Sequence, residues 1–231
     1  MKTIRFQIKE YEIFAVPVLS DNFDYLACRG GAAVLIDAGD AKPIFQALDE
    51  NDLQLQKILI THTHHDHTGG CRTIQDRLGV QSVSPGVEAG EFSLLGTCCF
   101  SISTPGHMVA HKCYYFPEPG ILFTGDTLIN GACGRLLGGT PGQLFSSLMR
   151  LCELPDETRV FGGHDYLAEN MNFALSVEPG NVDMKARLDL YQSDPSAAIF
   201  STLAEEKKTN PFLRVRSVEE FAELRRLKDR F

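Results

Sequence analysis

Four histidines and one aspartate lie within six consecutive residues of this 231-residue chain, in a segment that reads T-H-T-H-H-D-H. They are His62, His64, His65, Asp66 and His67. Imidazole nitrogens and carboxylate oxygens are suitable ligands for zinc, iron or manganese. Single polar residues are common in loops, but a cluster this dense is not, so the segment predicts a metal site.

Three more candidate ligands follow short apolar runs that predict buried strands. His107 follows Cys99–Ile102, Asp126 follows Ile121–Phe123, and His164 follows Arg159–Phe161, while the histidine cluster follows Lys57–Ile60. A glycine directly precedes each of these three ligands and lets the backbone bend tightly there. Because α/β proteins commonly place ligand sites at the C-terminal edge of a sheet, the candidates are expected to share such an edge.

The spacing of the candidates indicates two metal ions. His62 and His64 alternate, so an extended segment places them on the same side. Asp66 and His67 follow a turn and can address a second ion. Six or seven nitrogen and oxygen ligands are too many for one tetrahedral ion. The helical zinc-protease pattern H-E-x-x-H is absent from the sequence.

The elements that must position these ligands alternate between strands and helices. Ala32–Ile36 predicts another strand, and Pro43–Leu48 predicts a short helix. Thr140 and Pro141 have the pattern of a helix N-cap followed by proline at the first helical position. This alternation predicts a mixed α/β architecture.

The last quarter of the chain has a different pattern. No strand is predicted between Tyr166 and Phe231, and Ser217-x-x-Glu220 is a capping-box sequence that begins a final helix. We therefore predict an α/β domain over residues 1–165 and a helical annex over residues 166–231.

Composition and charge exclude several classes of protein. With 43% hydrophobic and 23% charged residues, the chain is neither collagen-like nor disordered. The net charge of 22 − 30 = −8 argues against nucleic acid as a partner. Seven scattered cysteines indicate reduced thiols, and neither a secretory signal nor a membrane-spanning run is predicted. We expect a cytoplasmic protein that binds no membrane, and infer no obligate protein partner.

The histidine cluster matches the signature H-x-H-x-D-H, and the chain from about Tyr11 to Tyr166 resembles the metallo-β-lactamase superfamily. This resemblance implies an αββα sandwich with a metal site at its edge. It does not fix the substrate, because the superfamily includes hydrolases, nucleases and oxygenases.

A finer resemblance, to the glyoxalase II (hydroxyacylglutathione hydrolase) family, runs over essentially the whole chain. In the first domain it rests on motifs such as Thr104-Pro-Gly-His107, Cys133-Gly-Arg135 and Gly163-His-Asp-Tyr166. In the annex it rests on Ser201-Thr-Leu-Ala-Glu-Glu206, Asn210-Pro-Phe-Leu-Arg214 and Lys228-Asp-Arg-Phe231. Most of the superfamily lacks this annex, so the annex match is the specific part.

The resemblance implies two divalent metal ions and a ligand set for each. It assigns His62, His64 and His107 to the first metal, Asp66, His67 and His164 to the second, and Asp126 to both. Zinc is the first expectation, with iron or manganese as alternatives, because mixed histidine and aspartate sites accept all three.

Three further polar residues have no place in these two ligand sets. The resemblance implies that Asp37 orients a ligand imidazole, although an aspartate before a turn glycine can also be a simple turn residue. His65 occupies a variable position of the motif, and we expect it not to bind metal. His111 is a candidate for contacting the ligands from outside the metal site.

The implied reaction is hydrolysis of S-D-lactoylglutathione and related S-2-hydroxyacylglutathiones to a 2-hydroxy acid and glutathione, the second step of methylglyoxal detoxification. Two metals lower the pKa of a bridging water towards neutrality. The resemblance implies that Asp66 acts in catalysis with this metal-bridging hydroxide. No Ser-His-Asp or Cys-His nucleophile motif is apparent in the sequence.

A glutathione thioester carries two carboxylates, so its site needs cations. The resemblance assigns Arg225 and Lys228 to glutathione binding, together with Arg135 and Tyr166. Arg225 and Lys228 are three residues apart and share a helix face. Their spacing alone favours a solvated surface, and the resemblance favours the binding role. Two departures concern the substrate end: Leu137 replaces a tyrosine found in some members, and Val83–Thr97 is short.

Other functions remain as alternatives at this point. The first is a glutathione persulfide dioxygenase of the same superfamily, which uses a single iron and would not require the annex. The second is a metal-binding module without catalysis, against which the complete ligand set argues. A secreted β-lactamase and a nucleic-acid-processing enzyme are disfavoured by the missing signal pattern and by the charge.

Overall fold

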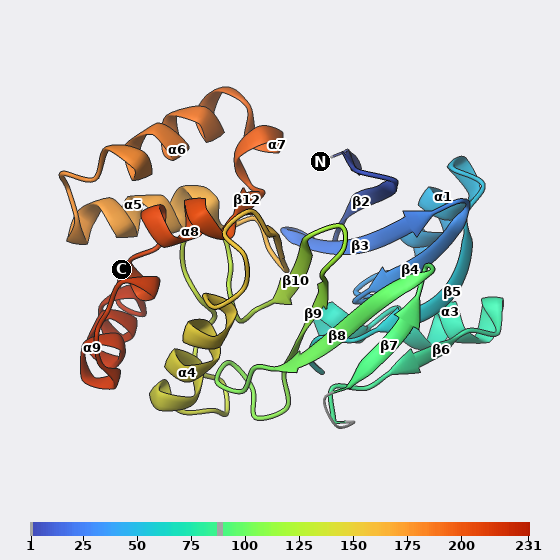
Figure 1. The fold of residues 1–231 in the computed structure, drawn as a ribbon, viewed down its shortest axis with the longest axis horizontal. Coiled ribbons are helices and arrows are strands. Elements are labelled where there is room, and N and C mark those ends of the chain that lie inside the picture. Colours follow the sequence, from blue (N-terminus) through green and yellow to red (C-terminus); the bar gives the residue numbers. More distant parts are fainter. Residues whose placement is uncertain (1, 87–89) are drawn as a thin grey trace. The chain divides into compact units, whose positions relative to one another are not determined.

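The structure is a computed structural model that describes residues 2–86 and 90–231, shown as a ribbon in Figure 1. The chain forms two compact units, of which the first comprises Met1–Ile102 and Lys112–Phe123. The second comprises Ser103–His111 and Thr124–Phe231. The predicted division at residues 165 and 166 rests on sequence motifs and stays a prediction. Among the described residues, no helix is long and apolar enough to cross a membrane.

The N-terminal strands of the first unit form one sheet in the hydrogen-bonded order β1-β2-β3-β4-β5-β6. Neighbouring strands from β1 to β4 are antiparallel, whereas β4, β5 and β6 run parallel. The strands are β1 (Ile4–Ile8), β2 (Tyr11–Val18), β3 (Asn22–Arg29), β4 (Ala32–Ile36), β5 (Gln54–Leu59) and β6 (Gln81–Val83). In the parallel register Ile36 lies opposite Leu59, so the C-terminal ends of β4 and β5 share one edge.

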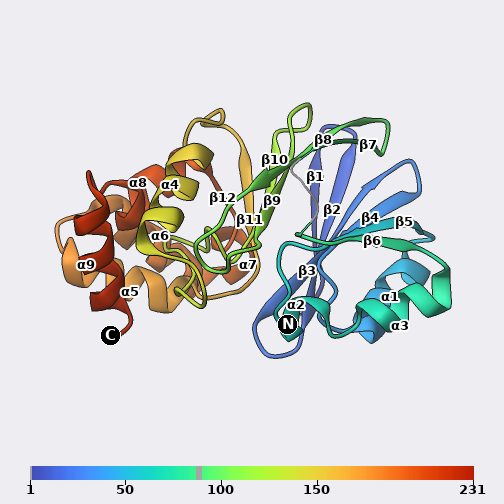
Figure 2. The same ribbon diagram turned by 90° about the horizontal axis from the view of Figure 1, so that it is seen from below.

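Two helices cover one face of this sheet, α1 (Ala41–Glu50) and α3 (Cys71–Leu78), as Figure 2 shows. Asp40 caps α1 by accepting a hydrogen bond from the N–H of Lys42. The helices bury Ile44 and Ile74 in a cluster that includes Leu35 of β4. Full burial of each such side chain stabilises the fold by about 1.5–3 kcal/mol.

A second layer of strands in the first unit packs against the sheet. Its strands β7 (Glu91–Leu94), β8 (Thr97–Ser103), β9 (Lys112–Phe116) and β10 (Ile121–Gly125) follow one another in that order. The ring centroids of Phe123 and Tyr25 are 5.4 Å apart, and the Tyr114 hydroxyl donates to the Ile60 carbonyl at 2.9 Å. These contacts hold β9 and β10 on β3 and on the end of β5.

The second unit is mostly helical. Its elements are α4 (Pro141–Leu151), β11 (Arg159–Gly162), α5 (Leu167–Val177), α6 (Val182–Ser193), α7 (Pro195–Ala198), β12 (Ser201–Thr202), α8 (Leu203–Thr209), the 3-10 helix η1 (Pro211–Leu213) and α9 (Val218–Lys228). The Phe212 ring in η1 contacts Phe173 of α5 and Phe221 of α9, with centroids 6.1 and 5.5 Å apart. These buried rings join three separate segments of the annex.

Most of the expected elements are confirmed, and β4 has the predicted bounds. The prediction of no strand after Tyr166 is wrong at one place, because Ser201 and Thr202 form β12 and pair with β11.

The final helix begins as predicted at Ser217, whose hydroxyl accepts from the Glu220 N–H. The Glu220 carboxylate binds the N–H of Arg216 instead of that of Ser217, so the capping box is not reciprocal. Of the short segment Val83–Thr97, residues 87–89 lie outside the described residues.

The α4 cap allows a direct test of this local structure. Thr140 and Gln143 form a reciprocal capping box at the surface. We expect Thr140→Ala to lower the free energy of unfolding by about 1 kcal/mol, because the N–H of Gln143 loses its acceptor. Thr140→Ser, which keeps the hydroxyl, serves as the control. Urea denaturation measures both, and an alanine variant as stable as the serine variant would contradict this account.

Candidate metal centre

In the first unit, the ends of the parallel neighbours β4 and β5 carry the first group of polar residues. Asp37 follows β4 and is buried. Its carboxylate accepts hydrogen bonds from the N–H and hydroxyl of Thr61, at 2.7 and 2.8 Å, and lies 2.9 Å from Nδ1 of His67. The φ angle of Asp37 is +60°, a conformation that non-glycine residues adopt only when surrounding contacts hold them in it.

Asp37 fixes the orientation of the His67 ring. With Nδ1 directed at the Asp37 carboxylate, Nε2 is directed towards Asp66, 3.6 Å from Oδ2. Asp66 and His67 lie in the short helix α2 (His65–Thr68), and the side-chain amide of Asn22 donates to Oδ2 of Asp66 at 2.9 Å. A histidine whose second nitrogen binds a carboxylate is the usual arrangement of a metal-binding imidazole.

His62 and His64 form a second pair of donors in the same unit. Nε2 of His62 lies 2.9 Å from Nδ1 of His64, and the two rings are nearly perpendicular with centroids 4.7 Å apart. This is the same-side placement that the alternation predicts. The two imidazoles are therefore close enough to bind one ion.

A close backbone approach lies beneath α2. A Cβ on Gly39 would lie 2.2 Å from the carbonyl oxygen of Asp66, so only glycine fits this position. The approach lets the N–H of Ala38 donate to the His67 carbonyl at 2.9 Å. The backbone of the segment that contains Asp66 and His67 is thus hydrogen-bonded directly to the residues that follow β4.

Asp24, which the sequence analysis did not single out, lies behind this group. It is fully buried in β3 and accepts a hydrogen bond from the N–H of Gly39 at 2.8 Å. Burial raises the pKa of Asp24 well above its ordinary value, and repulsion from the Asp37 carboxylate raises it further. The sequence feature that could have identified Asp24 is a carboxylate within an otherwise apolar segment. Aspartate is almost never fully buried without a partner, so such a position suggests a specific role.

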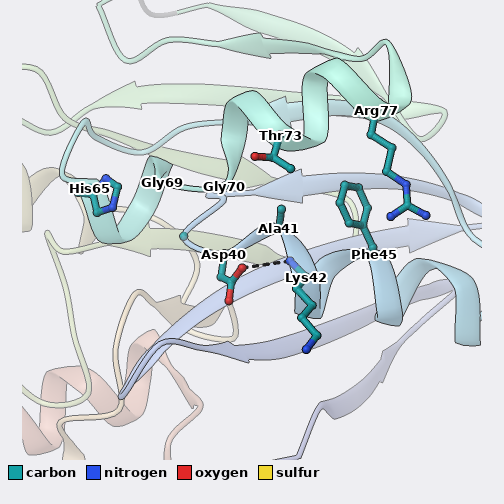
Figure 3. A pocket seen from close by; sticks show the side chains of 10 residues that line it. Asp40, Ala41, Lys42, Phe45, His65, Gly69, Gly70, Thr73 and Arg77 are labelled. Atoms are coloured by element: carbon teal, nitrogen blue, oxygen red, sulfur yellow. Dashed lines mark hydrogen bonds between the residues drawn. The ribbon is translucent and has the colours of Figure 1, made fainter.

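His65 is placed differently from its neighbours in the motif. It is exposed and lines a surface pocket together with Asp40, Lys42 and Arg77, as Figure 3 shows. The Arg77 guanidinium stacks over the Phe45 ring at 4.1 Å on the pocket wall. That His65 does not bind metal stays a prediction.

In the second unit, Asp126 lies at the centre of the other group of polar residues. It follows β10, and its two carboxylate oxygens contact different histidines. Oδ2 is 3.5 Å from Nε2 of His107, and Oδ1 is 3.4 Å from Nε2 of His164. One oxygen directed towards each imidazole is the arrangement expected of a carboxylate that bridges two ions.

Other residues of the second unit hold the His107 and His164 side chains in position. Nδ1 of His107 lies 2.8 Å from the carbonyl oxygen of Arg135, so Nδ1 carries the hydrogen and Nε2 has the lone pair through which an imidazole can bind a metal ion. The His164 ring stacks on Tyr166 with centroids 4.6 Å apart. The side-chain amide of Asn130 donates to the His164 carbonyl at 2.6 Å.

His111 has a positioning contact that the sequence indicated but did not define. It is buried, and its Nε2 accepts a hydrogen bond from the N–H of Asp126 at 3.2 Å. Its Nδ1 lies 2.9 Å from the Thr104 hydroxyl and 3.1 Å from the Thr127 hydroxyl. Since Nε2 accepts a hydrogen bond, the hydrogen of neutral His111 is on Nδ1.

The loop after Asp126 returns to it through a second close approach. A Cβ on Gly134 would lie 2.2 Å from the Asp126 carbonyl oxygen. The N–H of Gly134 donates to that oxygen at 2.9 Å. The neighbouring Cys133 is buried, which raises the pKa of its thiol to about 11, so this cysteine is not a thiolate nucleophile at neutral pH.

The four residues expected to bind substrate differ in exposure. Arg135 is exposed, and Tyr166 is 36% exposed. Arg225 of α9 is 3% exposed and donates to the Cys133 carbonyl at 2.8 Å. Lys228 lies 3.1 Å from the Glu169 carboxylate and over the Phe173 ring, and burial lowers its pKa. Arg225 and Lys228 therefore belong to a packed face of α9, unlike the solvated face that spacing alone allowed.

Comparison with known proteins gives matches over both parts of the chain. The family model described as "Hydroxyacylglutathione hydrolase C-terminus" matches residues 165–231. The model described as "Metallo-beta-lactamase superfamily" matches residues 22–103 and 100–164. The chain is 39% identical to a hydroxyacylglutathione hydrolase of Methylobacillus flagellatus, over 88% of this chain and 87% of that protein. It is 37% identical to one of Maricaulis maris, over 97% and 100%.

Solved structures with the same fold support this relationship. ETHE1 from Myxococcus xanthus matches with a TM-score of 0.68 and 26% identity, over 98% of this chain and 90% of that one. TTHA1623 in a di-iron-bound form matches with a TM-score of 0.64 and 27% identity, over 86% and 98%. The predicted metallo-β-lactamase fold with a C-terminal annex is confirmed, and the fold implies a binuclear centre of histidine and aspartate ligands.

The buried Asp24 generates a prediction about pH. Folding raises its pKa, so its stabilising contribution is complete below the unfolded value of about 3.9 and is lost as pH rises through the folded value. Asp24→Asn removes this dependence. Relative to the wild type, we expect the variant to gain about 1.4 kcal/mol for each unit by which folding raises the pKa, as pH rises from below the unfolded value to above the folded value.

Urea denaturation in the presence of a chelator measures this difference without a contribution from bound ions. Asp49→Asn, at an exposed position of α1, is the matched control for the substitution itself. Parallel pH profiles for Asp24→Asn and the wild type would contradict the account of Asp24.

Proposed function

The chain belongs to the hydroxyacylglutathione hydrolase family, and from this premise we propose that its two groups of ligands bind one pair of cations. As a member it is a thioester hydrolase that acts on S-2-hydroxyacylglutathiones and forms a 2-hydroxy acid and glutathione. This is the glyoxalase II activity that the sequence predicted, and the prediction is confirmed. What the proposal adds is the role of each residue.

The geometry of Asp126 is the observation that carries the proposal. Each of its carboxylate oxygens is directed towards a different histidine, His107 or His164. In the first unit the donors also fall into two pairs, one of two imidazoles and one of a carboxylate and an imidazole. We assign His62, His64 and His107 to the first ion, Asp66, His67 and His164 to the second, and Asp126 to both.

The chemistry of these donors fits divalent metal ions. All the ligand atoms are imidazole nitrogens or carboxylate oxygens, which suit zinc and also accept iron or manganese. When bound, two such ions supply Lewis acidity that lowers the pKa of water towards neutrality and stabilises charge on a carbonyl oxygen. Zinc is the proposed resident ion.

The residues around the ligands orient them and the attacking water. Asp37 holds His67, and the Arg135 carbonyl holds His107, so each ring presents Nε2. Asn22 holds one oxygen of Asp66, which restrains the carboxylate so that it can accept a hydrogen bond from the attacking water. In the proposed mechanism, water attacks the thioester carbonyl and the bond to sulfur breaks, which releases glutathione as the thiolate.

Glutathione binding is assigned to the C-terminal annex and the loop beside it. Lys228 and Arg225 supply positive charge for the substrate carboxylates, and the exposed Arg135 and Tyr166 complete the proposed site. We propose residues 166–231 as the glutathione-binding domain and residues 1–165 as the catalytic domain. The cytoplasmic location of the enzyme also stays a prediction.

A direct assay tests the metal-dependent activity. Purified enzyme should hydrolyse S-D-lactoylglutathione, and a chelator should abolish the release of glutathione, because the water is not activated without the ions. Restoring zinc, iron or manganese separately identifies the ion that restores the rate. A folded, metal-loaded protein that leaves this thioester intact would contradict the proposal, and oxygen uptake with glutathione persulfide would then favour the dioxygenase alternative.

The role of Lys228 has its own test. A hydrogen bond to a charged group contributes about 1.5–3 kcal/mol, so Lys228→Ala should raise KM about ten- to hundredfold and leave kcat within about twofold. Arg226→Ala is the matched control, because Arg226 is on the same helix and mostly exposed. Steady-state kinetics separate the two constants. Equal KM values for Lys228→Ala and Arg226→Ala would remove Lys228 from the proposed site.

A further inference from the structure

Three consecutive residues of the loop between Asp126 and Arg135 are each bound by a different side chain of the annex. The N–H of Gly131 donates to the Glu206 carboxylate at 2.9 Å. The Ala132 carbonyl accepts from the side-chain amide of Asn210 at 3.0 Å. The Cys133 carbonyl accepts from the Arg225 guanidinium at 2.8 Å. These anchors come from three separate annex positions: α8, the residue after α8, and α9.

The same loop holds the proposed metal ligands on its other side. Gly134 donates to the backbone carbonyl of Asp126, and the Arg135 carbonyl binds Nδ1 of His107. Asn130 donates to the backbone carbonyl of His164. Each of the three proposed ligands of the second unit is therefore joined to this loop by a hydrogen bond.

The anchoring side chains are built into the interior. Glu206 and Asn210 are fully buried, and Glu206 also binds the Arg187 guanidinium at 2.8 Å. Arg225 uses all three of its nitrogens inside the protein, with Nε and Nη2 on Asp229 and Nη1 on the loop. A buried polar group that loses its partner is costly, so these bonds constrain the loop more than surface contacts would.

We propose that Glu206, Asn210 and Arg225 are positioning residues that set the metal affinity of His107, Asp126 and His164. The annex then has a second role besides its proposed part in substrate binding. Without the anchors the loop still connects the ligands, but their donor atoms are no longer held in one geometry. The inference rests on the metal ligands assigned under the proposed function and goes beyond that function.

Arg225→Lys separates positioning from substrate binding. Lysine keeps the positive charge that a substrate carboxylate would need but lacks the planar fork that reaches Asp229 and Cys133 together. Arg214→Lys is the matched control. Arg214 also binds a carboxylate and backbone carbonyls within the annex, namely Glu178, Lys207 and Asn210, but none of the loop residues 131–133.

The measurement is titration of chelator-treated apoprotein with Co²⁺, followed by visible absorption and calorimetry. We expect the wild type and Arg214→Lys to bind two equivalents with affinities within twofold of each other. Arg225→Lys should bind at least one equivalent tenfold or more weakly and show altered cobalt bands. Circular dichroism establishes that each variant is folded before titration.

Asn210→Ser carries the same test if Arg225→Lys fails to fold. Serine can still cap the N–H of Phe212, as Asn210 does, but it is too short to reach the Ala132 carbonyl. Wild-type cobalt affinity and spectra in the folded variants, with only KM raised in Arg225→Lys, would overturn the positioning role and leave a substrate role. A wild type that binds fewer than two equivalents would instead overturn the proposed metal centre, and this inference with it.

Discussion

The orientation of the Asp126 carboxylate is the constraint on which the rest of the second unit depends. One of its oxygens faces His107 and the other faces His164. A bridging carboxylate must be fixed in position and rotation, because a small turn moves both oxygens at once. The structure fixes its backbone twice, through His111 on the N–H and Gly134 on the carbonyl. The loop that supplies Gly134 is in turn held by buried side chains of the annex.

In the first unit, an imidazole is held in position by a different set of hydrogen bonds. There the parallel pairing of β4 and β5 places Asp37 beside Thr61, and the Asp37 carboxylate then orients His67. The unfavourable φ of Asp37 is maintained by these bonds. In both units an aspartate therefore follows a strand directly, Asp37 after β4 and Asp126 after β10, and buried hydrogen bonds to another chain segment hold it in place.

The sequence indicated a set of candidate ligands because metal chemistry restricts residue type and spacing, and the assignment of each ligand stays a prediction. The alternation of His62 and His64 and the proline-marked start of α4 are local features that a sequence shows directly. It could not show that Asp24 is buried behind Asp37, that His111 accepts from the Asp126 N–H, or that Arg225 binds a backbone carbonyl. These contacts join residues far apart in the chain, and the backbone groups they bind carry no sequence signature. The two-residue strand β12 was missed because its pairing with β11 is a long-range contact and not a local pattern.

The central claim is that Asp126 joins two metal ions into one centre. Electron paramagnetic resonance of the manganese-loaded enzyme measures this directly, because two ions about 3.5–4 Å apart and bridged by a carboxylate are magnetically coupled. The account predicts the spectrum of a coupled pair in the wild type and its loss in Asp126→Asn. Two equivalents of manganese that give only the spectrum of isolated ions in the wild type would contradict it.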